Sequence, residues 1–165
     1  MSLSFELEIE KLEELEAYLS TIRDRVELED PQVKESLKEV FQAVMFEDLK
    51  KRFASSPSTT IGGTVYGGQE WRSLSEYYLA QRPERIGGQI YKDTFALQNS
   101  LIGLDPNNIS EFGSDRIYTF GTRLKYADKL QKMRAIIFMH PVLSDELVEA
   151  YEEFLVSELD NNRRR

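Results

Sequence analysis

Residues 67–100 read GGQEWRSLSEYYLAQRPERIGGQIYKDTFALQNS, and the rest of the chain is organised around this stretch. It contains the single tryptophan of the chain, Trp71. Spacings of three and four residues place Trp71, Leu74 and Tyr78 on one face of a helical turn. Because tryptophan carries a large apolar surface, we expect this face to pack against the core.

Short motifs follow one another in a fixed order along the chain. A W-x-x-L-S pattern precedes I-x-x-x-T-x-x-L-x-x-S-L, and G-T-x-x-x-Y-A comes later. The matching residues are Trp71, Leu74, Ser75, Ile90, Thr94, Leu97, Ser100, Leu101, Gly121, Thr122, Tyr126 and Ala127. In their order and spacing, these motifs resemble the phage virion morphogenesis family, the tail-completion proteins of Mu-like and related tailed phages. The resemblance covers residues 33–156.

This resemblance implies a structural virion protein and not an enzyme. It implies a tail-terminator or tail-completion protein of the neck, which assembles as a ring, expected to be a hexamer, where the tail joins the head. Its partners would be further copies of itself, a connector or stopper protein, and the tail tube or sheath protein. DNA would make only passing contact while it moves through the channel. Assembly would take place in the cytoplasm of the host bacterium.

Two other readings remain open. One is a head-side connector, or adaptor, ring. The other is a non-enzymatic assembly module whose N-terminal helix forms a coiled coil with a partner. The apolar positions from Phe5 to Val26 cover about three heptads, which is the lower limit for a coiled coil.

Composition bounds the class of protein. A chain of 165 residues with 41% apolar residues is long enough for one domain with one core. The absence of cysteine excludes disulfides and thiolate metal sites and fits a reducing cytoplasm. Neither a membrane span nor a signal peptide is indicated. A net charge of −8 argues against tightly held DNA, because phosphate binding needs clustered Lys and Arg.

We expect residues 1–29 to form an acidic amphipathic helix. Its apolar residues recur at spacings of three and four from Phe5 to Val26. Four glutamates are expected on its outer face, at a ring surface or at the DNA channel, because burying unpaired carboxylates is costly. These are Glu6, Glu10, Glu13 and Glu14.

Residues 30–159 are expected to form the tail-completion-like domain. Asp30-Pro31 predicts the start of a second helix that runs to about Phe53. Lys50, Lys51 and Arg52 near its end suit the helix dipole. The next segment, residues 54–68, is rich in Gly, Ser and Thr, which predicts a loop that is mobile until assembly orders it.

The second half of the domain predicts a small sheet. Strands are expected over 98–104, 109–112 and 116–120 as an antiparallel meander, with Tyr118 and Phe120 on one face of the last strand. The apolar run 134–139 predicts a fourth strand.

Two helices are expected in the same half of the chain. A short helix over 124–130 should carry Tyr126 and Ala127 inward, and a last helix should be capped by Ser144. Residues 160–165 predict a basic polar tail. The predicted fold class is therefore α+β: N-terminal helices, an antiparallel sheet of about four strands, and a C-terminal helix packed on the sheet.

The sequence predicts no catalytic residue, cofactor or metal site. The sole histidine, His140, has no second His or any Cys as a companion, so we interpret it as a hydrogen-bonded structural residue. The carboxylates are dense on helix faces that look solvated, where they do not converge on a two-metal site.

Overall fold

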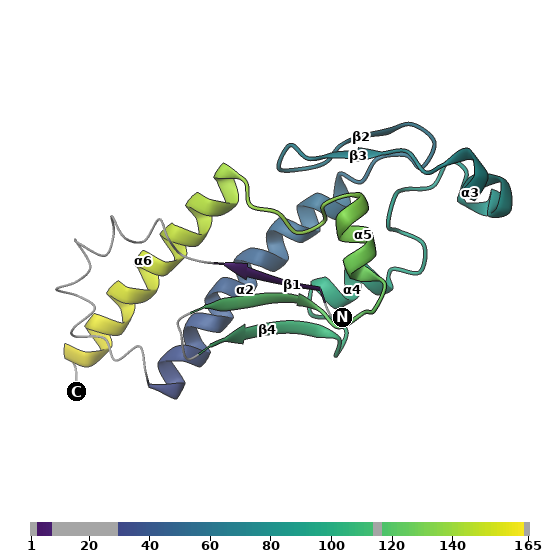
Figure 1. Cartoon of the computed structure of the whole chain (residues 1–165). Helices are drawn as coiled ribbons and strands as arrows, with labels where there is room; N and C mark the ends of the chain where they lie inside the picture. The colour runs from purple at the N-terminus through teal and green to yellow at the C-terminus, as the bar shows by residue number, and fades with distance from the viewer. Residues whose placement is uncertain (1–2, 8–29, 114–116, 164–165) are drawn as a thin grey trace.

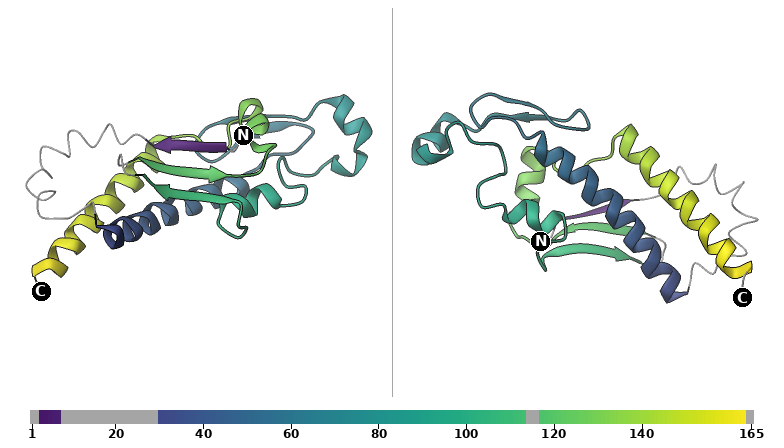
Figure 2. Two further views of the ribbon diagram at one scale, coloured as in Figure 1. Left: turned by 60° about the horizontal axis from the view of Figure 1, so that its bottom comes forward. Right: turned by 180° about the vertical axis from the view of Figure 1, so that it is seen from behind.

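The computed structural model describes residues 3–7, 30–113 and 117–163 (Figure 1). Within these residues the fold is α+β, as predicted. One face of a three-stranded antiparallel sheet packs on a long helix, a second long helix packs mainly on the first one and not on the sheet as predicted, and an arm projects from one end of this body (Figure 2). No helix in the described ranges is long and apolar enough to cross a membrane.

The sheet has the strand order β1-β5-β4. Strand β4 (Asn108–Phe112) and strand β5 (Tyr118–Thr122) form the predicted antiparallel hairpin. Along β5, Tyr118 and Phe120 are buried whereas Thr119 between them is half-buried, which confirms the predicted alternation.

Helix α2 (Pro31–Ala54) confirms the predicted second helix. Asp30 caps it, because its side chain accepts hydrogen bonds from the backbone N–H groups of Gln32 and Val33. The buried stripe of α2 packs on the sheet, where the Phe41 ring lies edge-on to Tyr118 with a centroid separation of 5.4 Å.

Helix α6 (Pro141–Arg163) lies alongside α2 (Figure 1). It begins at Pro141, so the expectation that Ser144 caps it is wrong. Proline suits the first turn of a helix, where its missing N–H would have no intrahelical partner. Leu143, Leu147, Phe154 and Leu155 are buried on α6. The helix also continues through residues 160–163, where the sequence predicted the polar tail.

Two of the predicted strands are absent from the sheet. The segment predicted as strand 98–104 is mostly helix α4 (Ala96–Leu101), because Leu97 and Leu101 are buried at helical spacing. The segment 134–139 has no regular structure, although Ile136 and Ile137 are buried as an apolar run predicts. The described sheet therefore has three strands and not four.

The predicted N-terminal helix is wrong at its start. Residues Leu3–Leu7 form strand β1, which pairs antiparallel with β5 and places Phe5 opposite Phe120. Pairing with the open edge of β5 satisfies backbone groups that a local apolar pattern cannot take into account. Glu6 consequently lies in a strand opposite Thr119. The remainder of the predicted helix, with Glu10, Glu13 and Glu14, lies outside the described residues.

The arm comprises residues 55–95. It contains a hairpin of β2 (Gly62–Thr64) and β3 (Glu70–Arg72), helix α3 (Glu76–Gln81) and the short 3-10 helix η1 (Pro83–Arg85). The prediction that Trp71 and Tyr78 share one face of a helical turn is wrong. Trp71 lies in β3, whereas Tyr78 lies in α3 and is 38% exposed.

Segment 54–68 is not a structureless loop in the folded chain. It contains β2, and Ser56, Thr59 and Val65 are buried. The Ser56 hydroxyl donates to the carbonyl of Ile90 at 2.6 Å. These contacts lie within one chain, so they count against mobility before assembly, which hydrogen exchange would measure.

Helix α5 (Ala127–Met133) occupies the place of the predicted helix 124–130. Ala127 is fully buried as expected. Tyr126 is 47% exposed, so the expectation that it points inward is wrong. Tyr126 directly precedes the first helical turn, so the burial of Ala127 does not carry the tyrosine into the core.

Candidate functional site

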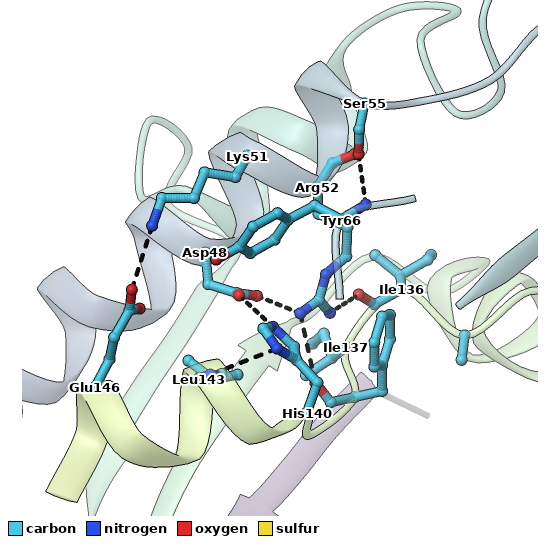
Figure 3. A network of polar contacts seen from close by, with 12 residues as sticks. Asp48, Lys51, Arg52, Ser55, Tyr66, Ile136, Ile137, His140, Leu143 and Glu146 are labelled. Carbon is cyan, nitrogen blue, oxygen red and sulfur yellow. Dashed lines mark hydrogen bonds and ion pairs between the residues drawn. The ribbon is translucent and has the colours of Figure 1, made fainter. Parts of the chain in front are cut away.

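A buried network of polar contacts lies where helix α2 meets residues 134–140 and the turn of the β2–β3 hairpin (Figure 3). Helix α2 supplies Asp48 and Arg52, one helical turn apart, and both side chains are almost completely buried. The two groups form an ion pair. Residues 134–140 and the turn of the β2–β3 hairpin close over this pair.

The guanidinium of Arg52 is held mainly by backbone oxygens. It donates to the carbonyl of Ile136 and, at 3.4 Å, to that of Phe138. Its carbon lies 3.8 Å from the centroid of the Phe138 ring, a cation–π distance. Burial lowers the pKa of Arg52, while the charge of Asp48 raises it. The pair therefore offsets much of the cost of removing a cation from water.

His140 completes the cluster. Its Nε2 lies 2.6 Å from an Asp48 carboxylate oxygen, and its Nδ1 lies 3.4 Å from the backbone N–H of Leu143. Because that N–H can only donate, Nδ1 accepts and Nε2 carries the proton donated to Asp48. His140 is therefore hydrogen-bonded through both ring nitrogens, as expected.

The hairpin turn packs directly on this histidine. Gly67 has a positive φ of 91°, and a Cβ at this position would lie 2.7 Å from the His140 ring. The adjacent Tyr66 ring stands perpendicular to the imidazole at 5.4 Å, and its backbone N–H donates to the Ser55 hydroxyl. Glycine is therefore required here by both the backbone and the close approach.

A second layer of contacts surrounds the cluster. Lys51 lies over the Tyr66 ring at 5.4 Å and forms an ion pair with Glu146 of α6 at 3.3 Å. Together these contacts join helix α2, the arm, residues 134–140 and helix α6. We call Asp48, Arg52 and His140 the arm-root cluster.

The polar groups of the arm-root cluster bond to one another and to backbone groups. An Asp–His pair can serve a nucleophile, yet both imidazole nitrogens of His140 are occupied and its side chain is buried. No group of three or more His, Asp or Glu residues within the described ranges is placed to hold a metal ion. Because Tyr66 and Gly67 of the arm pack on His140, the cluster contributes to fixing the arm to the body.

The motif residues divide into two structural groups. The first lies at the root of the arm. Trp71 is fully buried, and its indole N–H donates to the carbonyl of Ala135 at 2.8 Å. Leu74 donates its backbone N–H to the Thr59 carbonyl, and Ser75 caps α3 by accepting from Tyr78.

The second group lies where α4 meets the end of β5. Leu97, Ser100 and Thr122 are buried there, with Gly121 in the strand beside Thr122. Thr94 accepts from the N–H of Ala96 just before α4. The motif residues are therefore mainly packing and capping residues, and the structure does not bring them into one site.

Sequence reasoning missed Asp48 and assigned Arg52 to the helix dipole. A signal was present in the sequence. Phe41, Met45, Asp48 and Arg52 follow one another at spacings of four, three and four residues, so the two charged residues lie on the same buried side of α2 as the two apolar ones. Charged residues of opposite sign in an apolar row indicate a buried pair.

Comparison with known proteins assigns no family: no family model matches the sequence, and neither the curated proteins nor the solved structures contain a match.

Proposed function

We propose that this chain is a structural subunit that assembles into a ring at the phage neck as a tail-terminator or tail-completion protein. The motif order described above points to the phage tail. The observation that carries the assembly role is the arm, which is anchored firmly at its root and exposes large apolar side chains along its length.

The arm carries a large share of the exposed apolar residues of the described structure. Five lie within its 41 residues, numbers 55–95: Ile61 at 83% exposure, Tyr77 at 75%, Ile86 at 59%, Phe95 at 49% and Tyr78 at 38%. Fully burying such a side chain contributes about 1.5–3 kcal/mol. Covering several of them is enough to drive association, and aromatic residues are favoured at protein interfaces.

Phe95 adds a second sign of an interaction surface. It is half-exposed and has a positive φ of 59°, in the left-handed region that bulky residues rarely adopt. Such strain costs about 1–3 kcal/mol and tends to be retained at functional positions.

The anchoring of the arm makes it suitable for a defined contact. Trp71 packs edge-on against Tyr91 at 5.0 Å, and Tyr91 donates its hydroxyl to the Leu130 carbonyl at 3.0 Å. Arg134 donates to the backbone carbonyls of Arg72 and Ser73, each at 2.6 Å. An arm fixed in this way presents its apolar residues with little loss of conformational entropy on binding.

The first test measures mass in solution together with negative-stain images. The proposal expects rings from the unaltered chain and folded monomers from the arm variant Ile61→Ser/Tyr77→Ser. Val142→Ser, at an exposed position outside the arm, is the matched control and should still form rings. An unaltered chain that stays monomeric at tens of micromolar would rule the proposal out.

The second test separates the tail from the head. Heads and tails from the phage that encodes the chain are resolved by sedimentation and probed with an antibody to the chain. Protein in the tail fraction supports tail completion, and protein in the head fraction supports the head-side connector instead. Absence from both fractions excludes a virion role.

A further inference from the structure

Helix α5 and the residues just before it form a basic surface. Lys125, Lys129 and Lys132 are exposed, and so are Tyr126 at 47% and Met133 at 56%. The acidic residue of this segment, Asp128, is paired with Lys132 at 2.9 Å. The surface therefore combines a net positive charge with two large apolar side chains. We call it the α5 surface.

Helix α6 presents the opposite charge. Between Pro141 and Asn162 its sequence contains acidic residues and no Lys or Arg. Spacings of three and four place one set of exposed residues on a single face: Glu149, Glu152, Glu153, Val156 and Asp160. Four of these residues also line a shallow hollow, together with Ser157 and Asn161. We call this face the α6 surface.

The two surfaces lie on different sides of the molecule. Figure 1 shows α6 on one side of α2 and α5 on the other, and the view from behind in Figure 2 agrees. The α6 surface of one chain is therefore placed to meet the α5 surface of a different chain.

We propose that the α5 surface of one subunit docks onto the α6 surface of the next copy of this chain, an inference that rests on the proposed ring. The occupant is a second copy because the same chain carries both complementary surfaces. A two-fold contact of α6 with α6 would instead bring like charges together, which is unfavourable. Tyr126 and Met133 would meet Val156 within the charged rim.

The direction of this contact matters for assembly. A contact between two different surfaces leaves one of each free at the ends of a growing chain of subunits. Such heterologous contacts produce a closed ring when the rotation between neighbours closes on itself. The proposed function alone does not say which faces of adjacent subunits touch. The α5–α6 contact defines these faces.

Charge reversal tests this pairing on the full chain. One variant, Lys125→Glu/Lys129→Glu, makes the α5 surface acidic. The other, Glu149→Lys/Glu152→Lys/Glu153→Lys, leaves Asp160 as the acidic residue of the α6 surface and makes this surface basic. Each alone should weaken ring formation at least tenfold, measured as the protein concentration at half assembly by mass photometry. The control, Lys38→Glu/Lys50→Glu on α2, carries the same charge change as the first variant and should assemble as the unaltered chain does.

Mixing the two variants gives the sharpest result. In an equimolar mixture, the acidic α5 surface of the first variant can bind the basic α6 surface of the second variant. The basic α5 surface of the second variant can bind the acidic α6 surface of the first. The mixture should therefore form rings in which the variants alternate, with an even number of subunits. Circular dichroism and thermal unfolding establish that each variant is folded.

A measurement without substitutions guards against misfolded variants. Rings of the unaltered chain should dissociate as salt rises from 0.05 to 0.5 M, because the Debye length falls from more than 10 Å to less than 8 Å. Rings unaffected by salt and by either reversal would overturn the α5–α6 contact while leaving the proposed function intact. A mixture that fails to assemble from folded variants would also overturn it. An unaltered chain that never forms rings would overturn the proposed function itself.

Discussion

The body and the arm are stabilised in different ways. The body is held by apolar packing between α2, α6 and one face of the sheet, with rings such as Phe41 and Tyr118 in contact. The arm is held at its root by the buried tryptophan, by donors to backbone carbonyls and by the packing of Tyr66 and Gly67 on His140 of the arm-root cluster. Beyond its root it exposes apolar side chains. Under the proposed function, we expect the body to fold alone and the apolar side chains of the arm to be covered by another subunit.

The strongest test of this comparison is Trp71→Ala. Truncating a fully buried tryptophan costs about 3–5 kcal/mol, and here it also removes the hydrogen bond to Ala135. We expect that loss in the free energy of unfolding, measured by urea denaturation with far-ultraviolet circular dichroism. The exposed Tyr77→Ala in the same arm should leave the stability of the monomer nearly unchanged. Equal stability of both variants would contradict a tryptophan-anchored arm.

The arm-root cluster is tested by Asp48→Ala. The change leaves Arg52 buried without its carboxylate partner. We expect the free energy of unfolding to fall by about 3 kcal/mol. This is the lower end of the usual range, because the Ile136 carbonyl still accepts a hydrogen bond from Arg52. The matched control is Glu47→Ala, which removes an exposed partner of Lys50 on the same helix and should change little.

A double variant separates charge from packing in this cluster. Asp48→Leu/Arg52→Leu should be more stable than Asp48→Ala, since it removes both buried charges. The same urea denaturation compares the two. A double variant less stable than Asp48→Ala would show that the hydrogen bonds of Arg52 to residues 136 and 138 outweigh the charge pairing.

Tyr118 gives a smaller effect, confined to the body. Burial raises the pKa of Tyr118 well above its ordinary value, opposed by its hydrogen bond with Ser110. A raised pKa in the folded state contributes stability below the unfolded pKa of about 10, and this contribution is lost as the pH rises through the folded value.

Tyr118→Phe should remove both the hydrogen bond to Ser110 and the pH-dependent contribution of the phenol to stability. It loses the hydrogen bond, which is worth about 1 kcal/mol at neutral pH. Above about pH 10, its unfolding free energy should fall less steeply than that of the unaltered chain. Urea unfolding between pH 8 and about pH 11 measures the two slopes, and parallel slopes would contradict the burial of this phenol.

The smallest expected effect is local to the arm. Ser75→Ala removes the cap of α3, which is worth about 0.5–1 kcal/mol. Because α3 lies beyond the anchored root, hydrogen exchange should accelerate at residues 78–81 while the amides of α2 stay unchanged. Acceleration throughout α2 would show that arm and body unfold as one unit.

Elements whose signals are local could be predicted from the amino-acid sequence alone. The Asp30 cap and apolar stripe of α2, the alternation along β5 and the burial of Trp71 follow from neighbouring residues and from side-chain size. The hydrogen bonding of His140 was also expected from the sequence, which offers no second histidine or cysteine as a companion metal ligand.

Elements that depend on partners far away in the sequence could not be predicted in this way, because contacts formed in the folded chain set them. Residues 3–7 became a strand because the edge of β5 was open, and residues 134–139 stayed irregular because their carbonyls accept from Arg52 and Trp71. The arm-root cluster joins residues 92 positions apart, Asp48 and His140. Hydrogen bonding between distant segments competes with local propensity, and its outcome is set by which backbone groups the folded chain leaves unsatisfied.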